Sequence, residues 1–170
     1  MIGEIVLRVI LVGIGATLVM DGWALARRRL FGIASLDYAL VGRWLGHMRQ
    51  GRFRHEAIAR VPPVPGERLL GWTCHYLIGV LFAALMLTAV GPQWLCRPTP
   101  MPALTLGALS VAAPFLLLQP AFGMGLAASR MPGAWRLRRQ SLLSHLLFGL
   151  GLYLAGWVGA QMAVSPLCGG

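Results

Sequence analysis

The sequence predicts an all-α fold, an integral membrane four-helix bundle with an additional amphipathic interfacial helix in its first cytoplasmic loop. Three observations predict this fold: an apolar composition, four long apolar segments, and arginines gathered in two of the connections between them. Of the 170 residues, 57% are hydrophobic and only 12% are charged, whereas soluble domains carry about 25% charged residues. This composition excludes an ordinary water-soluble enzyme, a disordered chain and a disulfide scaffold.

A transmembrane helix needs about 20 mostly apolar residues to cross a hydrocarbon core roughly 30 Å thick. Four segments meet this requirement, and they are residues 5–26, 69–91, 103–129 and 141–165. Strands of a membrane barrel would alternate lipid-facing apolar and inward polar residues, and residues 77–90 show no such alternation. We therefore expect a single transmembrane domain over residues 1–170.

The arginines predict the orientation of the spans, because cytoplasmic loops are enriched in positive charge. All 15 basic residues are arginine, and the formal net charge is +10. The connections 27–68 and 130–140 hold all of them except Arg8 and Arg97. We expect a multi-pass protein of the bacterial inner (cytoplasmic) membrane, with both termini on the periplasmic side. The excess charge then suits anionic lipids, and no nucleic-acid partner is required.

The long connection 27–68 contains a helical pattern of its own. Its apolar residues recur every four positions, and they are Leu36, Leu40, Trp44 and Met48. Ser35 is the expected N-cap and Gly51 the expected stop. A helix with this apolar face would either lie in the membrane interface or cover the inner ends of the bundle.

Small residues at four-residue spacing predict where the spans approach one another. The fourth segment carries Gly151, Ala155, Gly159 and Ala163, and the third carries the pairs Ala103/Gly107 and Gly123/Ala127. We expect contacts within the bundle, with homodimerisation as the alternative use of the same stripe. Pro114 and Pro120 each remove a backbone hydrogen bond, so the third helix should kink.

The cysteines divide between the spans and the connections. Cys74 lies inside the second segment, whereas Cys96 and Cys168 lie on the predicted outer, oxidising side. A disulfide between Cys96 and Cys168 is one expectation, and two unpaired thiols are the alternative.

Polar side chains inside the spans are candidates for function, because an ionisable group in lipid costs about 2.5–3.5 kcal/mol even on mild scales. Counted from the inner helix ends, Asp21, His75 and His145 lie at depths of roughly 8, 9 and 6 Å. Met124 comes to a similar depth, and Gln119 lies close by. The sequence therefore predicts an intramembrane polar site formed by these five residues.

Three roles are open for this site. Asp21, His75 and His145 offer a carboxylate and two imidazoles, which are suitable ligands for zinc, iron or manganese. The same groups could instead pass protons. In the third, structural role, Asp21 reaches the membrane interface and each histidine hydrogen-bonds a neighbouring helix.

Four short motifs extend over nearly the whole chain. They are Gly13-x-Gly15-Ala16-Thr17-x-x-Met20-Asp21, Gly42-Arg43-Trp44 followed by His47, Gly71-Trp72-x-x-His75-Tyr76, and His145-x-x-Phe148-Gly149-x-Gly151-x-Tyr153. With these motifs the sequence resembles a bacterial family of small four-helix inner-membrane proteins that is catalogued as a domain of unknown function. The resemblance implies a four-span protein in which Asp21, His75 and His145 belong to the family pattern, and it implies no activity.

Two functions compete for this sequence. We expect a small transport or binding module whose polar site takes protons, a metal or a small polar solute. The alternative is a non-catalytic accessory or structural subunit of a larger membrane complex. We expect no enzyme, because the sequence has no Gly-x-Ser-x-Gly elbow, His-Glu-x-x-His helix or P-loop. A conducting path through only four spans would require a homo-oligomer.

Overall fold

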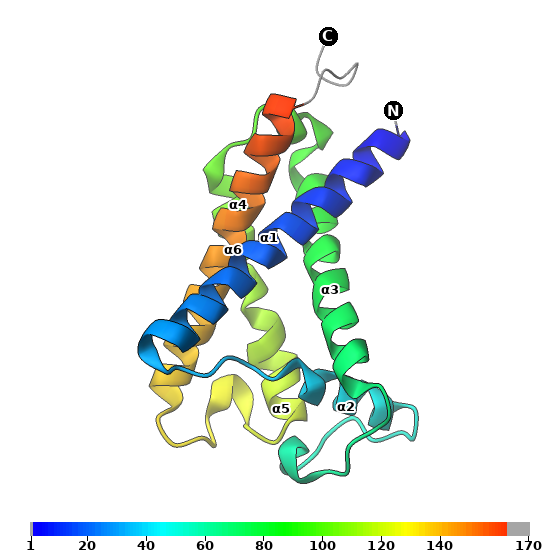
Figure 1. Ribbon diagram of the computed structural model, residues 1–170, viewed down its shortest axis with the longest axis vertical. Helices are drawn as coiled ribbons and strands as arrows, with labels where there is room; N and C mark the ends of the chain where they lie inside the picture. The colour runs from blue at the N-terminus through cyan, green and yellow to red at the C-terminus, as the bar shows by residue number, and fades with distance from the viewer. Residues whose placement is uncertain (1, 163–170) are drawn as a thin grey trace. The chain divides into compact units, whose positions relative to one another are not determined.

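The computed structural model describes residues 2–162, and the regular elements within that range are all helical. Four helical segments of this range are long and apolar enough to cross a membrane (Figure 1). They are α1 (Ile2–Phe31), α3 (Glu67–Val90), the interrupted segment Pro100–Ala121, and α6 (Ala134–Met162). The short helix α2 (Tyr38–Met48) lies in the first connection. The predicted all-α fold with four long apolar helices and one additional short helix is confirmed.

The chain folds as two compact units, and each is described by itself. The bundle unit comprises the described parts of residues 1–34, 76–110 and 144–170, and so contains a part of every candidate span. The loop unit comprises residues 35–75 and 111–143. It contains α2, most of the connection 27–68 and all of the connection 130–140.

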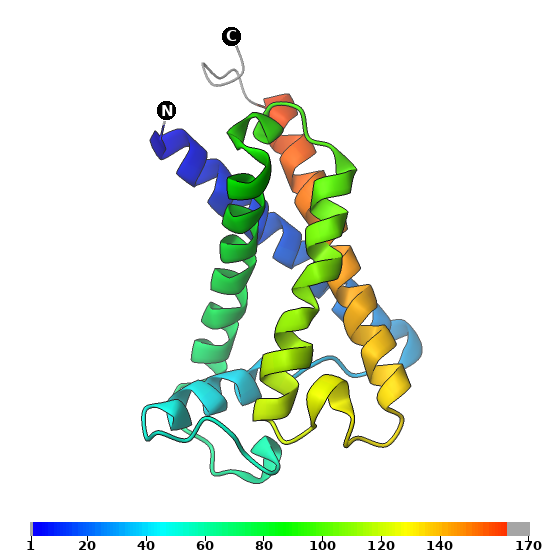
Figure 2. The ribbon, with the colours of Figure 1, turned by 180° about the vertical axis from the view of Figure 1, so that it is seen from behind.

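All four spans contribute apolar side chains to the core of the bundle unit. The buried residues of this core are Val12 and Ala16 from α1, Ala83, Met86 and Leu87 from α3, Trp94 and Leu95 from the short helix η2 (Pro92–Leu95), Ala103 from α4 (Pro100–Ser110), and Phe148 and Leu152 from α6. The helix α4 crosses the middle of α6 (Figure 2), and their small residues are in direct contact there.

The small residues of α6 and α4 form contacts within the bundle unit, as predicted. A Cβ atom added at Gly107 would lie 2.7 Å from the Cα of Gly149, and one added at Gly151 would lie 2.8 Å from the Cα of Ala16. Ala155 also contacts α1, because a Cβ atom added at Gly15 would lie 2.8 Å from the side chain of Ala155. Gly159 faces open space, and Ala163 lies outside the described residues.

The third span departs from a regular α-helix where its prolines predicted a disturbance. α4 ends at Ser110, and a π-helical turn, η3 (Pro114–Leu118), follows before the short helix α5 (Gln119–Ala121). In this turn the Gln119 N–H donates to the carbonyl of Pro114, five residues earlier instead of the four of a regular α-helix.

The expectation that this helix continues to residue 129 is wrong, because helical geometry ends at Ala121. Gly123 and Gly125 have φ values of +88° and +76°, and Ala127 is also left-handed with φ +45°. A right-handed helix cannot contain these conformations. The predicted Gly123/Ala127 helical pair is therefore wrong as well, and these residues form a turn instead.

The helix α2 buries its apolar face within the loop unit. Val41 and Trp44 pack against Ile58, Ala121 and Phe122, and the Trp44 indole N–H donates to the Phe53 carbonyl at 2.9 Å. The N-cap of α2 lies two residues later than expected. Asp37, and not Ser35, is the N-cap, and its carboxylate accepts a hydrogen bond from the Ala39 N–H at 3.0 Å.

Candidate functional sites

The first polar contact inside the spans joins α1 and α3. The Tyr76 hydroxyl donates to Oδ2 of Asp21 at 3.0 Å. One turn before Asp21, the Thr17 side chain is only 1% exposed, and its hydroxyl donates to the Gly13 carbonyl at 2.8 Å. Gly79 lies directly against that hydroxyl, and any larger residue there would collide with it. The interface between α1 and α3 is therefore both closely packed and polar.

The second polar contact joins α4 and α6. Nδ1 of His145 lies 2.7 Å from Oγ of Ser110, and the same Oγ lies 2.7 Å from the Gly107 carbonyl oxygen. A hydroxyl has one hydrogen. When Ser110 donates to the Gly107 carbonyl, its oxygen accepts a hydrogen bond from the Nδ1–H of His145.

His75 belongs to the loop unit, where it lies among aromatic rings. It stacks on Tyr38 with 4.0 Å between ring centroids and meets the edge of Trp72 at 5.9 Å. Tyr38 and Trp72 contact each other at 4.7 Å. His75, Tyr38 and Trp72 therefore form an aromatic cluster within the loop unit.

Gln119 and Met124 also belong to the loop unit. The Gln119 side chain is 7% exposed, and its Oε1 is buried without a hydrogen-bond partner in the described structure. Met124 packs on the apolar core of the same unit.

The structure thus gives Asp21 and His145 separate hydroxyl partners in the bundle unit. Within residues 2–162, no three His, Cys, Asp or Glu side chains form a group that could hold a metal ion.

The predicted Cys96–Cys168 pair cannot be placed, because Cys168 lies outside the described residues. Cys74 is a free, half-buried cysteine that packs against the core of the loop unit.

A bidentate ion pair in the loop unit joins two residues that the sequence pattern did not connect. Arg43 Nε and Nη2 donate to the two carboxylate oxygens of Glu67 at 2.9 and 2.8 Å. These hydrogen bonds raise the pKa of the Arg43 guanidinium. Glu67 lies in the first turn of α3, where a carboxylate suits the helix dipole. The 24-residue separation from Arg43 carries no periodic signal.

His47 and His55 form an imidazole pair in the same unit, with 5.6 Å between ring centroids. His47 Nε2 lies 3.1 Å from the Pro62 carbonyl oxygen. His47 Nδ1 and His55 Nε2 are buried without a hydrogen-bond partner among the described residues. Burial lowers the pKa of His55, and the charges of His47 and Arg52 lower it further. These effects favour the neutral form of His55.

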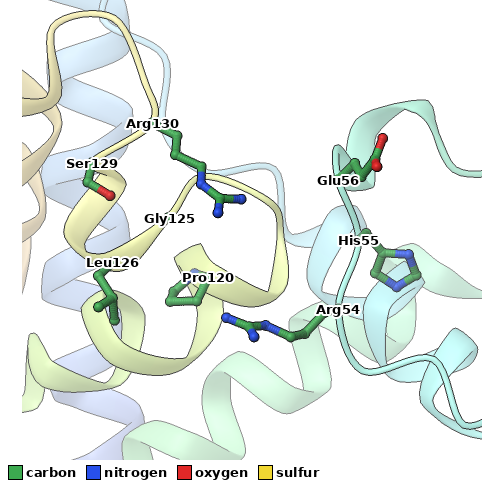
Figure 3. A pocket seen from close by; sticks show the side chains of 8 residues that line it. All are labelled: Arg54, His55, Glu56, Pro120, Gly125, Leu126, Ser129 and Arg130. Atoms are coloured by element: carbon green, nitrogen blue, oxygen red, sulfur yellow. The ribbon is translucent and has the colours of Figure 1, made fainter.

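The loop unit also contains an open cleft of about 500 Å³. It is lined by Arg54, His55, Glu56, Pro120, Gly125, Leu126, Ser129 and Arg130 (Figure 3). The ion pairs found in residues 2–162 are Arg8–Glu4 and Arg43–Glu67, so neither arginine of the cleft is neutralised by a described carboxylate. Sequence reasoning treated Arg54 and Arg130 only as topology signals, since nothing in their spacing indicates that they share a cleft.

Comparison with known proteins identifies the family but no function. Residues 10–159 match the family described as "Protein of unknown function (DUF2938)". A search of curated proteins found no match, and a search of solved structures found none either. The family match includes at least the greater part of each candidate span, together with Asp21, His75 and His145. The chain, with its four candidate membrane helices, therefore belongs to the DUF2938 family of proteins of unknown function.

Proposed function

We propose that this protein is a small membrane transport or binding module whose bundle unit takes up and releases protons at Asp21 and His145. One observation carries the proposal: each of these ionisable groups lies in a candidate span and is hydrogen-bonded to a neutral hydroxyl on a different helix. Ionisable residues inside spans are expensive and commonly mark ion pathways or proton relays.

Hydroxyl partners suit proton exchange, because a hydroxyl both donates and accepts hydrogen bonds. Tyr76 donates to the Asp21 carboxylate, and a protonated Asp21 could donate to the Tyr76 oxygen in return. His145 can keep its Nδ1–H bond to Ser110 while Nε2 gains or loses a proton. Both contacts therefore survive a change of protonation state, so that titration need not separate the helices.

The location follows from the arginine distribution. We assign the protein to the bacterial inner membrane, with residues 27–68 and 130–140 on the cytoplasmic side and both termini outside. We assign no chemical reaction to it. The variants Asp21→Asn and His145→Gln, described next, also test whether the site takes a metal or a small polar solute in place of protons.

Proton movement can be measured with the full chain reconstituted in vesicles that contain a pH-sensitive dye. After an external acid pulse, wild-type vesicles should acidify faster than empty vesicles. Asp21→Asn and His145→Gln should each remove most of this difference, whereas Glu4→Gln, a matched change near the start of α1, should leave it unchanged.

Wild-type vesicles that acidify no faster than empty ones, or variants that behave like the wild type, would eliminate proton transport. Metal content and bound solutes should then be measured in purified wild type and in the same two variants. Stable co-purification with a larger membrane complex, together with unaltered binding in the variants, would favour the accessory-subunit function instead.

A further inference from the structure

We infer that the cleft of the loop unit binds a phosphate-bearing anion, with Arg54 and Arg130 as its cationic partners and Ser129 as a hydroxyl donor. This site is separate from the polar contacts of the bundle unit and does not depend on the proposed proton function.

The two guanidinium groups provide the charge. The side chains of Arg54 and Arg130 come from opposite walls of the cleft and extend toward Pro120, whereas the Glu56 carboxylate points away from them (Figure 3). Neither arginine has a carboxylate partner in the part of the chain that the structure describes. Guanidinium groups match the geometry of phosphate oxygens and bind them in pairs of parallel hydrogen bonds.

The wall that carries Ser129 and Arg130 is fixed by its backbone. Gly125 has φ +76°, and a Cβ atom there would lie 2.5 Å from the Ser129 Oγ and 2.9 Å from the Arg130 Cγ. The Arg130 N–H closes this turn by donating to the Met124 carbonyl at 2.9 Å. Only glycine at position 125 lets the hydroxyl and the arginine side chain lie this close to the chain.

The opposite wall is held to the first by main-chain hydrogen bonds. The His55 N–H donates to the Ala121 carbonyl at 2.9 Å, and the Ile58 N–H donates to the Phe122 carbonyl at 3.3 Å. Gly123 lies directly against the Glu56 carbonyl, where no side chain would fit. The cleft is therefore formed before any ligand arrives, which reduces the cost of ordering its residues on binding.

The position of the cleft in the chain relates it to the membrane surface. Its second wall begins at the end of the candidate span Pro100–Ala121 and ends just before α6, the next span. Leu126, at the rim, is 61% exposed. Phosphate at that level can come from an anionic lipid headgroup, whose acyl chains would contact such an apolar residue, or from a soluble phosphate ester. Both ligands present the same phosphate chemistry to the arginines.

The experiment compares two probes on the full-length protein in neutral detergent. Binding of phosphatidylglycerol in mixed micelles and of glycerol phosphate in solution is measured by titration calorimetry, with phosphatidylcholine as the uncharged-headgroup reference. For the wild type we expect saturable binding of at least one anionic probe. Selective binding of phosphatidylglycerol assigns the site to lipid headgroups, and comparable binding of glycerol phosphate assigns it to soluble phosphate esters.

The variant Arg54→Gln/Arg130→Gln should lose at least about tenfold in affinity for the bound probe. Arg49→Gln removes the same kind of exposed charge from the same connection, outside the cleft, and should change the affinity by less than about twofold. Arg54→Lys/Arg130→Lys keeps the charge and should give an intermediate loss. Absence of saturable binding in the wild type, unchanged binding in the double glutamine variant, or an equal loss in Arg49→Gln would overturn the inference.

Discussion

The guanidinium of Arg43 and the carboxylate of Glu67 face each other in two parallel hydrogen bonds of 2.9 and 2.8 Å. Glu67 Oε2 also accepts the Val64 N–H at 3.0 Å, and Arg43 Nη1 donates to the Val61 carbonyl at 2.9 Å. A single ion pair thus joins α2, the first turn of α3 and the proline-containing connection between them. Both side chains are largely buried, so the pair is protected from solvent screening.

Loss of this pair should destabilise the loop unit. Arg43→Ala leaves the Glu67 carboxylate without its partner, and we expect the unfolding free energy to fall by roughly 1.5–3 kcal/mol, the range for hydrogen bonds to charged groups. Arg43→Lys keeps the charge but loses the bidentate geometry, so its unfolding free energy should lie between those of the wild type and Arg43→Ala. Circular dichroism during an SDS titration of detergent-solubilised protein measures this change. The prediction is wrong if Arg43→Ala unfolds no earlier than Arg49→Ala, its exposed control.

The contact between α2 and α3 should tolerate no side chain at its glycines. A Cβ at Gly42 would collide with the Glu67 carbonyl, and one at Gly71 would collide with the Tyr38 carbonyl. Gly71→Ala should therefore cost about 1–3 kcal/mol or more through overpacking. Gly22→Ala is the matched control, because a Cβ in that helical position meets nothing within 4 Å. The same SDS titration should show early unfolding for Gly71→Ala alone, and equal behaviour of both variants would contradict the close approach.

Acid should weaken the loop unit through His55. Its pKa is lowered by burial and by His47 and Arg52, so protonation at low pH favours the unfolded chain. The stabilising contribution is present above the ordinary histidine pKa and is lost as the pH falls through the lowered value. Between about pH 7.5 and pH 5.5, the melting temperature of wild type should decrease more than that of His55→Gln. Parallel pH profiles for the two proteins would refute this role of His55.

Membrane orientation can be tested by introduced cysteines. In a chain with Cys74, Cys96 and Cys168 replaced by serine, the exposed positions Ala59 and Gln93 are changed to cysteine one at a time. A membrane-impermeant maleimide applied to cells with an intact inner membrane and permeabilised outer membrane should label Gln93→Cys. It should reach Ala59→Cys only after the inner membrane is opened. The reverse pattern would overturn the predicted orientation.

Much of the fold is readable from the sequence, because hydropathy and small-residue spacing are local properties. The four apolar segments became four long helices, and Gly107 and Gly151 lie at the helix contacts that their spacing predicted. The choice between two nearby N-cap residues was harder to predict from the sequence. Ser35 and Asp37 are both competent N-caps, and the structure uses Asp37. The end of the third span was placed too late, because the glycines after Ala121 were counted as small helix-contact residues and not as left-handed turn residues.

The sequence by itself determined that four apolar helices form and that ionisable groups such as Asp21 and His145 lie within them. Only the tertiary structure decided their partners. Tyr76 is 55 positions from Asp21, and Ser110 is 35 positions from His145. The cleft between Arg54 and Arg130 is likewise formed by segments far apart in the chain. The physical reason is that composition and periodicity fix which residues enter a helix, whereas the rotation of each helix about its axis is fixed by packing against its neighbours.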